Sequence, residues 1–413
     1  MSKTEPRFTP EAKPDRSAIT FVLITLVINA MGFGIIIPVL PDLIAEVSGT
    51  SISGAALWGG YLSFSFAAMQ FLVGPTVGNL SDRFGRRPVL LCSLGILALD
   101  FLIMALASSL AMLFLGRILS GIAAATNSTA NAFMADISSK EQRAKNFGLL
   151  GAAFGFGFII GPVIGGIAGE YGTRAPFYTA AALAFANFCF GLIVLPETLE
   201  TQKRRPFQWL RANPVGGLKQ VAKIPMVAWF MVTVFLFETA NFVYPSVWAY
   251  YTKETFKWST SEVGLSLAAV GAGIVIVQGW LIRHVLRFLG ETRTFVAGAI
   301  IGISGTIGLT FATEGWMFYM WLPAVALAGM ATPAISALMS NVTPDDAQGE
   351  LQGVRSSVIA IVTIISPVLM TQLFGHFTKA GASVYFPGAP FLVAAALAVL
   401  AFLPFCIGVK RNG

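Results

Sequence analysis

The chain is short of charge. Of its 413 residues, 11% are Asp, Glu, Lys or Arg and 55% are hydrophobic, and the mean hydropathy is +0.74. A soluble domain carries about 25% charged residues and needs them to cover its surface. Charge this sparse excludes an ordinary soluble protein and predicts that lipid surrounds most of the chain.

Histidine and cysteine are scarce as well. The two histidines, His284 and His376, lie far apart in the sequence, and the three cysteines, Cys92, Cys189 and Cys406, form no CxxC pair. The sequence therefore offers almost no residues that could form a metal site or a His-based catalytic triad. We expect no metal, no cofactor and no enzymatic activity.

We also expect no cleavable signal peptide. Residues 1–17 are polar and rich in proline and charge, without an apolar h-region. We expect a cytoplasmic N-terminal tail over residues 1–18.

What the chain has instead is long apolar segments. A helix needs ~20 apolar residues to cross the hydrocarbon core, and six such segments precede a polar stretch while six follow it. They cover residues 19–44, 54–80, 88–106, 111–136, 147–169, 175–195, 226–251, 263–282, 294–313, 317–339, 351–374 and 390–409.

This pattern predicts an all-α membrane protein with twelve transmembrane helices in two six-helix bundles. The N-terminal bundle covers residues 19–196 and the C-terminal bundle covers residues 226–409. A basic cytoplasmic linker, residues 197–225, joins them, and residues 410–413 form a cytoplasmic C-terminal tail.

The basic residues support this topology. With a cytoplasmic N-terminus, 21 of the 27 Lys and Arg residues fall on the cytoplasmic side, four fall outside and two lie in or at the edge of spans. Such a positive-inside bias is typical of multi-pass membrane proteins. It also explains the net charge of +7 by contact with anionic headgroups, without a nucleic acid partner.

A weak internal repeat relates the two halves. Residues 136–167 can be laid on residues 341–372 without gaps, so that Gly148 meets Gly353 and Pro162 meets Pro367. These positions fall in the fifth and the eleventh span. Two six-helix halves repeated in parallel are what major facilitator transporters show.

A polar turn between the second and third spans carries the sharpest motif. Its sequence, GNLSDRFGRR, resembles the signature loop of the major facilitator superfamily. The glycines permit a tight turn and close helix contact, and the carboxylate accepts hydrogen bonds from arginines or caps a helix. We predict a cytoplasmic latch that holds one conformation; the alternative is a solvated basic turn. The gate residues are Gly78, Asp82, Arg83, Gly85, Arg86 and Arg87.

The fifth span carries a second motif, GFIIGPVIGG, which resembles the antiporter motif of drug exporters in this superfamily. Small residues four apart make a flat groove for a partner helix, and proline removes a backbone hydrogen bond. The alternative is helix packing without directional meaning. The motif residues are Gly157, Gly161, Pro162, Gly165 and Gly166.

Three ionisable residues inside spans are coupling candidates, because such residues are functional hypotheses by default. Asp100 and Arg117 are expected at nearly equal depth on adjacent helices, which predicts a buried pair. That pair is either proton-responsive or purely structural. Glu238 is the only acid well inside the second half, and a lone carboxylate in a low-dielectric cavity can exchange a proton near neutral pH. The alternative is a wet carboxylate that binds a cationic substrate or only lines the path.

Across nearly the whole chain the order of motifs resembles the tetracycline-resistance efflux proteins, which are twelve-helix drug:H⁺ antiporters. The match runs from Ala30–Gly34 and Pro38–Pro41, through Gln70, the signature loop and Asp100, to Arg117 and the fifth-span motif. The resemblance implies that Gln70, Asp100 and Arg117 are important for transport.

The chain departs from that family at three positions. Asn29 replaces an acid in the first span, Ile274 stands where the family has histidine, and Ile301 lies where the family has aspartate. The proton site and the metal–tetracycline contacts of the second half are therefore largely missing. Glu238 is a candidate for the acidic role.

We therefore expect a proton-coupled antiporter that exports a small amphipathic molecule, such as a tetracycline-like drug, by alternating access. The proton gradient supplies the energy. The partners are the substrate, protons and lipid, the unit is a monomer, and the location is a bacterial inner membrane. The substrate cavity is predicted to include Asn29, Gln70, Asn241, Tyr244 and Trp248.

Two alternatives stay open. A proton symporter or uniporter that imports a nutrient would share this architecture, and the antiporter motif is the feature against it. A membrane-embedded enzyme would need a polar constellation at one membrane face, and a receptor would not need two repeated halves.

Overall fold

The computed structural model describes residues 16–125, 127–138, 142–208 and 227–412. All regular elements within these ranges are helices. The first helix begins at Arg16, three residues before the predicted start of the first span. Most of the predicted N-terminal tail and the linker from residue 209 onward lie outside the described residues.

The N-terminal bundle consists of eight helices and provides six crossings. The helices are α1 (Arg16–Ile36), α2 (Leu40–Ser48), α3 (Ile52–Phe84), α4 (Arg86–Leu106), α5 (Leu110–Ala124), α6 (Asn127–Asp136), α7 (Arg143–Gly169) and α8 (Ala175–Val194).

The C-terminal bundle follows after the short turn η1 (Thr201–Lys203). Its elements are α9 (Ala228–Asn241), α10 (Val243–Thr255), α11 (Thr260–Ile276), the π-helical turn η5 (Val277–Leu281), α12 (Ile282–Thr310), α13 (Gly315–Ala328), α14 (Ala331–Asn341), the turn η6 (Asp345–Ala347), α15 (Gln348–Thr378), α16 (Ala389–Leu400) and α17 (Phe402–Asn412).

Eleven segments of the described chain are long and apolar enough to cross a membrane, and one of them crosses twice. Residues Thr260–Thr310 form a run of 51 residues, about 77 Å at 1.5 Å per residue, which is more than two hydrocarbon thicknesses. Gly290 interrupts the run with φ 70° and ψ 173°, a conformation open to glycine. Six crossings therefore also lie in this half, and the all-α fold of twelve spans is confirmed.

Four spans at corresponding places of the two halves are each divided into two helices. The first breaks between α1 and α2, the fourth between α5 and α6, the seventh between α9 and α10, and the tenth between α13 and α14. A further break in the twelfth span separates α16 from α17. In transporters built from repeats, such discontinuous helices surround the binding site near the bilayer midplane.

Serine side chains cap the N-termini of three helices at one end of the molecule. Ser51 accepts a hydrogen bond from the N–H of Gly54 at the start of α3, and Ser109 caps α5 in the same way. Ser259 and Glu262 form a reciprocal capping box at the start of α11. These caps satisfy backbone N–H groups that the first turn leaves free.

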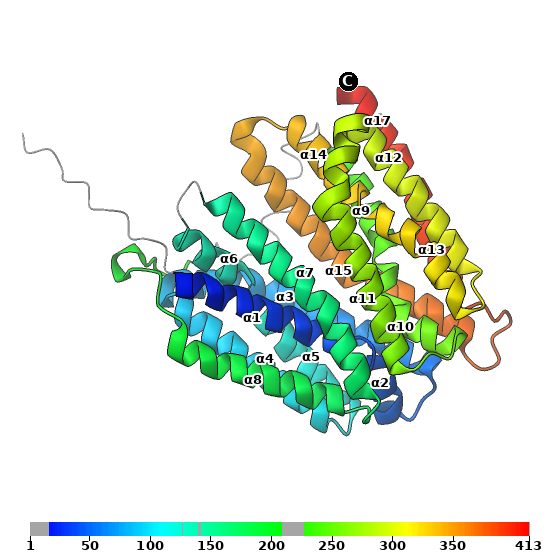
Figure 1. Ribbon diagram of the computed structural model, residues 1–413, viewed down its shortest axis with the longest axis horizontal. Coiled ribbons are helices and arrows are strands. Elements are labelled where there is room, and N and C mark those ends of the chain that lie inside the picture. The colour runs from blue at the N-terminus through cyan, green and yellow to red at the C-terminus, as the bar shows by residue number, and fades with distance from the viewer. Residues whose placement is uncertain (1–15, 126, 139–141, 209–226, 413) are drawn as a thin grey trace, which may run out of the picture.

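The two bundles meet along two helix pairs, α3 with α15 and α7 with α11. The pairs are equivalent under the predicted repeat, since α7 and α15 each contain the matched proline, Pro162 or Pro367. In Figure 1 the bundles converge near α2 and α10 and diverge toward the side where α1 begins and α17 ends. We call the side where α1 begins and α17 ends the proximal end and the opposite side the distal end.

Large apolar side chains cover the outside of both bundles. Ile193 is 85% exposed, and Phe185, Phe288 and Leu403 are also exposed. A water-facing surface of this kind would be a liability, but the same surface suits a lipid environment, where helices that are apolar all round belong.

Candidate transport site between the two bundles

A seam of glycines closes the distal end. Gly59 of α3 lies against the hydroxyl of Tyr250, and Gly375 of α15 lies against Leu57. Gly264 of α11 touches the carbonyl of Pro162. A Cβ atom at any of these glycines would overlap its neighbour, so the bundles approach closely only because side chains are missing there.

Two hydrogen bonds across the same seam join α3 to α15. Ser53 Oγ donates to the Thr378 carbonyl over 2.9 Å, and Gln372 Nε2 donates to the Leu57 carbonyl over 3.2 Å. All four residues lie near the distal ends of their helices. The distal end is therefore closed by close helix packing at glycines and by hydrogen bonds to backbone carbonyls of the opposite bundle.

A cavity of about 670 Å³ lies between the bundles on the proximal side of this seam. Its walls come from α7 and α11, with contributions from Ile37 of the first span and from Tyr244 and Pro245 of α10. Tyr244 and Gln278 are its polar wall residues, and the rest are apolar or glycine. An apolar cavity with a few polar groups is typical of small-molecule sites.

Glu238 lies in the same span as Tyr244, four residues before the break at Phe242. Thr332, next to the break in the tenth span, donates a hydrogen bond to Glu238 Oε1 over 2.8 Å. The carboxylate is half-buried. The charge of Arg355 on α15 acts on it at longer range than a salt bridge. The acid is thus held by a neutral donor and lies within electrostatic reach of a cation on a third helix.

Asp100 and Arg117 form the predicted buried pair. Arg117 donates from an η-nitrogen to Asp100 Oδ2 over 3.2 Å, and the two side chains are 9% and 0% exposed. The other carboxylate oxygen of Asp100 and the Arg117 Nε have no hydrogen-bond partner among the residues that the structure describes. The pairing is confirmed, and the role of the pair in coupling stays a prediction.

The other predicted cavity residues are spread over different places. Asn29 lines a narrow cavity of about 60 Å³ inside the N-terminal bundle, together with Thr25 and Ser93. Gln70 lines a groove between α3 and α15. Asn241 lies half-buried at the break between α9 and α10.

Trp248 does not line the cavity between α7 and α11. It is 3% exposed, it packs against Phe318 with ring centroids 4.7 Å apart, and its indole N–H donates to Ser266 Oγ over 2.9 Å. Trp248 is therefore not part of the predicted substrate cavity here, because an aromatic cluster at the distal end buries it.

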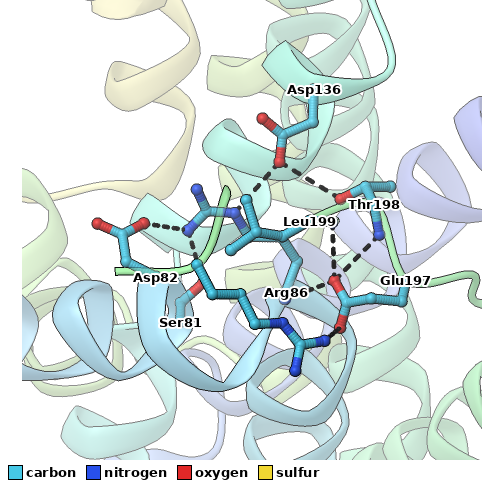
Figure 2. A network of polar contacts seen from close by, with 8 residues as sticks. Ser81, Asp82, Arg86, Asp136, Glu197, Thr198 and Leu199 are labelled. Atoms are coloured by element: carbon cyan, nitrogen blue, oxygen red, sulfur yellow. Dashed lines mark hydrogen bonds and ion pairs between the residues drawn. The ribbon is translucent and has the colours of Figure 1, made fainter. Parts of the chain in front are cut away.

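The signature loop forms a charge network around Arg86 (Figure 2). One η-nitrogen of Arg86 donates to Asp82 over 2.7 Å and to Ser81 over 2.9 Å, while Nε donates to Asp136 of α6 over 3.2 Å. Arg86 is 9% exposed, and buried charges of this kind are normally paired. The predicted bond between Asp82 and an arginine is confirmed.

The two glycines of this loop differ. Gly85 has φ 108° and stands against the Glu197 carboxylate, so the position excludes a side chain. Gly78 lies inside α3, and its nearest neighbour, Ser128, is at an ordinary distance of 3.7 Å from an added Cβ. Only Gly85 makes the tight turn that the sequence predicts for both.

The remaining gate arginines have minor contacts. Arg87 donates to the Leu192 carbonyl over 2.8 Å, and Arg83 lies 5.1 Å from the ring centre of Phe84.

The first linker residues bind to the signature loop. Glu197 accepts backbone N–H bonds from Arg86, Thr198 and Leu199 (Figure 2). Farther along, Asn79 and the backbone of Gln208 exchange two hydrogen bonds of 2.7 and 3.3 Å. The network thus lies within the N-terminal bundle and the start of the linker.

The fifth-span motif has two faces. An added Cβ at Gly161 would lie 2.7 Å from the Met31 carbonyl, and Gly157 and Gly165 approach Val27 and Ile35 of the same helix α1 equally closely. The predicted groove is confirmed, with α1 as the partner helix. Gly166 lies on the other face, toward α11, and Pro162 meets both helices, with its ring against Gly34 of α1 and its carbonyl against Gly264 of α11.

Several residues of the site lack a local sequence signal. Thr332 and Gln278 are ordinary polar residues in apolar spans, and Arg355 counts in the sequence only as a charge near a span end. Asp136 and Glu197 are acids at helix ends. Arg355 lies about 10 Å from the start of α15, and nothing in the sequence marks which face of the helix it occupies.

Comparison with known proteins agrees with this architecture. The family model described as Major Facilitator Superfamily matches residues 22–329 and, in a second match, residues 241–411. The chain is 36% identical over 397 residues to the class C tetracycline resistance protein of Escherichia coli, covering 96% of this chain and 97% of that protein. It is 35% identical to the class B protein of Escherichia coli, over 87% of this chain and 89% of that protein.

A solved structure shares the fold. A bacterial homologue of the human lysosomal transporter Spinster, in an inward-facing and unoccupied conformation, superposes with a TM-score of 0.77 at 16% identity, over 97% of this chain and 98% of that chain. Matched from end to end by sequence and fold, the chain belongs to the Major Facilitator Superfamily of transporters, in the branch that includes the tetracycline resistance proteins.

Proposed function

We propose that this protein is a proton-coupled antiporter that exports a small amphipathic molecule, with tetracyclines as the first candidates. One observation carries the proposal: an apolar cavity between the bundles shares a broken span with a half-buried carboxylate, Glu238. The cavity suits an amphipathic ligand, and the carboxylate can bind and release a proton. The names of the relatives direct the choice of tetracycline.

The proximal end is assigned to the cytoplasm. The signature loop, the start of the linker and α17 lie there, and they carry Arg83, Arg86, Arg87 and Lys203 to Arg205, whereas the distal end carries Arg174, Lys253, Lys257 and Lys379. The positive-inside rule supports this orientation. The closed distal seam then faces the outside, and the conformation is inward-facing.

Glu238 is proposed to carry the transported proton. When ionised, the carboxylate attracts Arg355 on α15 and keeps its bond to Thr332. A proton from the outside cancels the attraction, and a substrate group entering from the cytoplasm competes with it. Two protonation states that favour different conformations are enough to couple the two fluxes.

The Asp100–Arg117 pair is the second proposed coupling element. Its buried position requires that any proton reach it through the core of the N-terminal bundle. The protein is proposed to work as a monomer in the inner membrane of a bacterium, with both chain ends in the cytoplasm. The proton gradient is its energy source and no cofactor takes part.

The test is growth of an efflux-deficient bacterial host that expresses the chain, on plates with graded tetracyclines, followed by uptake into inverted membrane vesicles with and without a pH gradient. We expect resistance and gradient-dependent accumulation inside inverted vesicles. The Glu238→Gln variant should lose both, whereas Glu314→Gln, at an exposed acid before α13, should keep both. Accumulation that ignores the pH gradient, or that runs in the opposite direction, contradicts the proposal.

A further inference from the structure

An ion pair connects the two bundles at the distal end. Lys253 of α10 donates to Asp42 Oδ2 of α2 over 2.7 Å and to Thr260 Oγ1 over 3.2 Å. The Lys253 side chain is 9% exposed and the Asp42 side chain is 31% exposed. Asp42 belongs to the N-terminal bundle, and Lys253 and Thr260 belong to the C-terminal bundle. The pair is therefore a contact between the two moving parts.

A second polar contact lies beside the pair. Glu170, directly after α7, accepts the backbone N–H of Ser261 over 3.1 Å in the first turn of α11. A carboxylate at a helix N-terminus is favourable. Helices α7 and α11 come close enough for this bond because Gly166 and Gly169, which have no side chains, lie against Thr260 and Ser261.

A neighbouring ion pair shows what a contact within one bundle looks like. Arg174 donates to Glu46 over 3.0 Å at the same end of the molecule, and both residues belong to the N-terminal bundle. Rocking of one bundle against the other preserves this pair. The same rocking must break the bond between Asp42 and Lys253, because the distal ends of the bundles have to separate to open a path outward.

We propose that Asp42 and Lys253 are positioning residues that form an outer latch and set how readily the distal gate opens. They act on the seam and do not touch the substrate. Lys253 is nearly buried, so separating it from Asp42 without a replacement partner is unfavourable, and this resists opening. That the gate releases the substrate rests on the proposed function. That the ion pair keeps the seam closed does not depend on it.

The latch is tested by the accessibility of the seam in the full-length protein in liposomes. Cys92, Cys189 and Cys406 are replaced by serine, and Ser53→Cys serves as the reporter, because Ser53 is 4% exposed in the closed seam. A maleimide that does not cross membranes labels this cysteine only when the gate opens. We expect slow labelling in the parent.

Asp42→Asn and Lys253→Met should each speed labelling by at least about fivefold, and the charge-swapped pair Asp42→Lys with Lys253→Asp should restore the slow rate. Glu46→Gln is the matched control and should change the rate little. Equal rates in the parent and the single variants overturn the latch, and so does an equal acceleration by Glu46→Gln.

Two further measurements separate other causes. Size-exclusion profiles of the variants exclude misfolding, and the conservative variant Asp42→Glu should label nearly as slowly as the parent; fast labelling with Asp42→Glu also counts against the latch. Labelling needs no drug and no pH gradient. If the latch variants accelerate labelling while no tetracycline is exported, the proposed function fails and the latch stands.

Discussion

The two bundles treat their buried charges differently. In the N-terminal bundle Asp100 and Arg117 are almost fully buried and 3.2 Å apart. In the C-terminal bundle Glu238 is half-buried, its partner Thr332 is neutral, and Arg355 stands at longer range. The halves share one architecture, yet one binds its carboxylate to a cation and the other leaves it free to change partners.

This difference indicates a division of work. Removing one member of a buried ion pair leaves the other charge without a partner, which is costly to the fold. Protonation of a carboxylate whose hydrogen-bond partner is a neutral hydroxyl leaves no ion-pair partner uncompensated, so Glu238 can change its protonation at smaller cost. We infer that the first pair contributes more to stability and that Glu238 contributes more to coupling.

The largest expected effect is on stability. Asp100→Asn leaves Arg117 buried without a counter-charge, and the free energy of unfolding should fall by about 3–5 kcal/mol. The loss should appear as a lower thermal transition in detergent. If Asp100→Asn keeps full stability and only abolishes the pH dependence of transport, the pair is a proton site and the comparison is reversed.

The next effect concerns the distal seam, to which both bundles contribute glycines in close contact. Gly59→Ala places a methyl group against Tyr250, and such overpacking costs about 1–3 kcal/mol. The closed distal end should lose population, visible as longer distances between spin labels at Tyr171 and Val384, which are exposed on the two bundles.

Gly74→Ala is the matched control for the seam, because it lies on the same helix α3 with no neighbour within 4 Å of an added Cβ. It should leave the spin-label distances unchanged. Equal shifts in both variants would mean that helix propensity, rather than the seam, controls the opening.

The third effect concerns coupling. Glu238→Gln keeps the size and the hydrogen-bonding capacity of the side chain, so the free energy of unfolding should change by less than about 1 kcal/mol. Gradient-driven transport should fall at least tenfold, which corresponds to about 1.4 kcal/mol. A transport assay and a thermal melt on the same preparation measure both. If Glu238→Gln unfolds the protein at lower temperature but keeps gradient-driven transport, Glu238 has a structural role like that of the Asp100–Arg117 pair, and the proposed difference between the two bundles is wrong.

The smallest effect depends on pH at the distal end. The bond from the Ser261 backbone N–H lowers the pKa of Glu170 in the closed state below its ordinary value of about 4.3. Its contribution to closure is therefore complete above the ordinary pKa and is lost as the pH falls through the lowered pKa. Spin-label distances should stay constant from pH 7 to about pH 5 and lengthen slightly in stronger acid. Glu170→Gln should remove this component, and an unchanged acid response in that variant would assign the effect to another group.

The fold could be predicted from the sequence because its main signals are local. The length of each apolar run and the rise per helical residue fix the number of crossings and the depth of each side chain. Equal depth is why the bond between Asp100 and Arg117 was predictable. The turn at Gly85 and the groove of the fifth-span motif were also predictable, since each depends on glycine at a set spacing.

What tertiary structure alone decided is the direction in which each side chain faces. A helix that is apolar all round gives no sign of which face meets another helix, so the sequence could not show that Trp248 is buried among aromatic rings or that Arg355 lies within electrostatic reach of Glu238. The latch between Asp42 and Lys253 joins residues 211 positions apart on different bundles. Only the packing of all the helices, and the angle between the bundles, brings such pairs together.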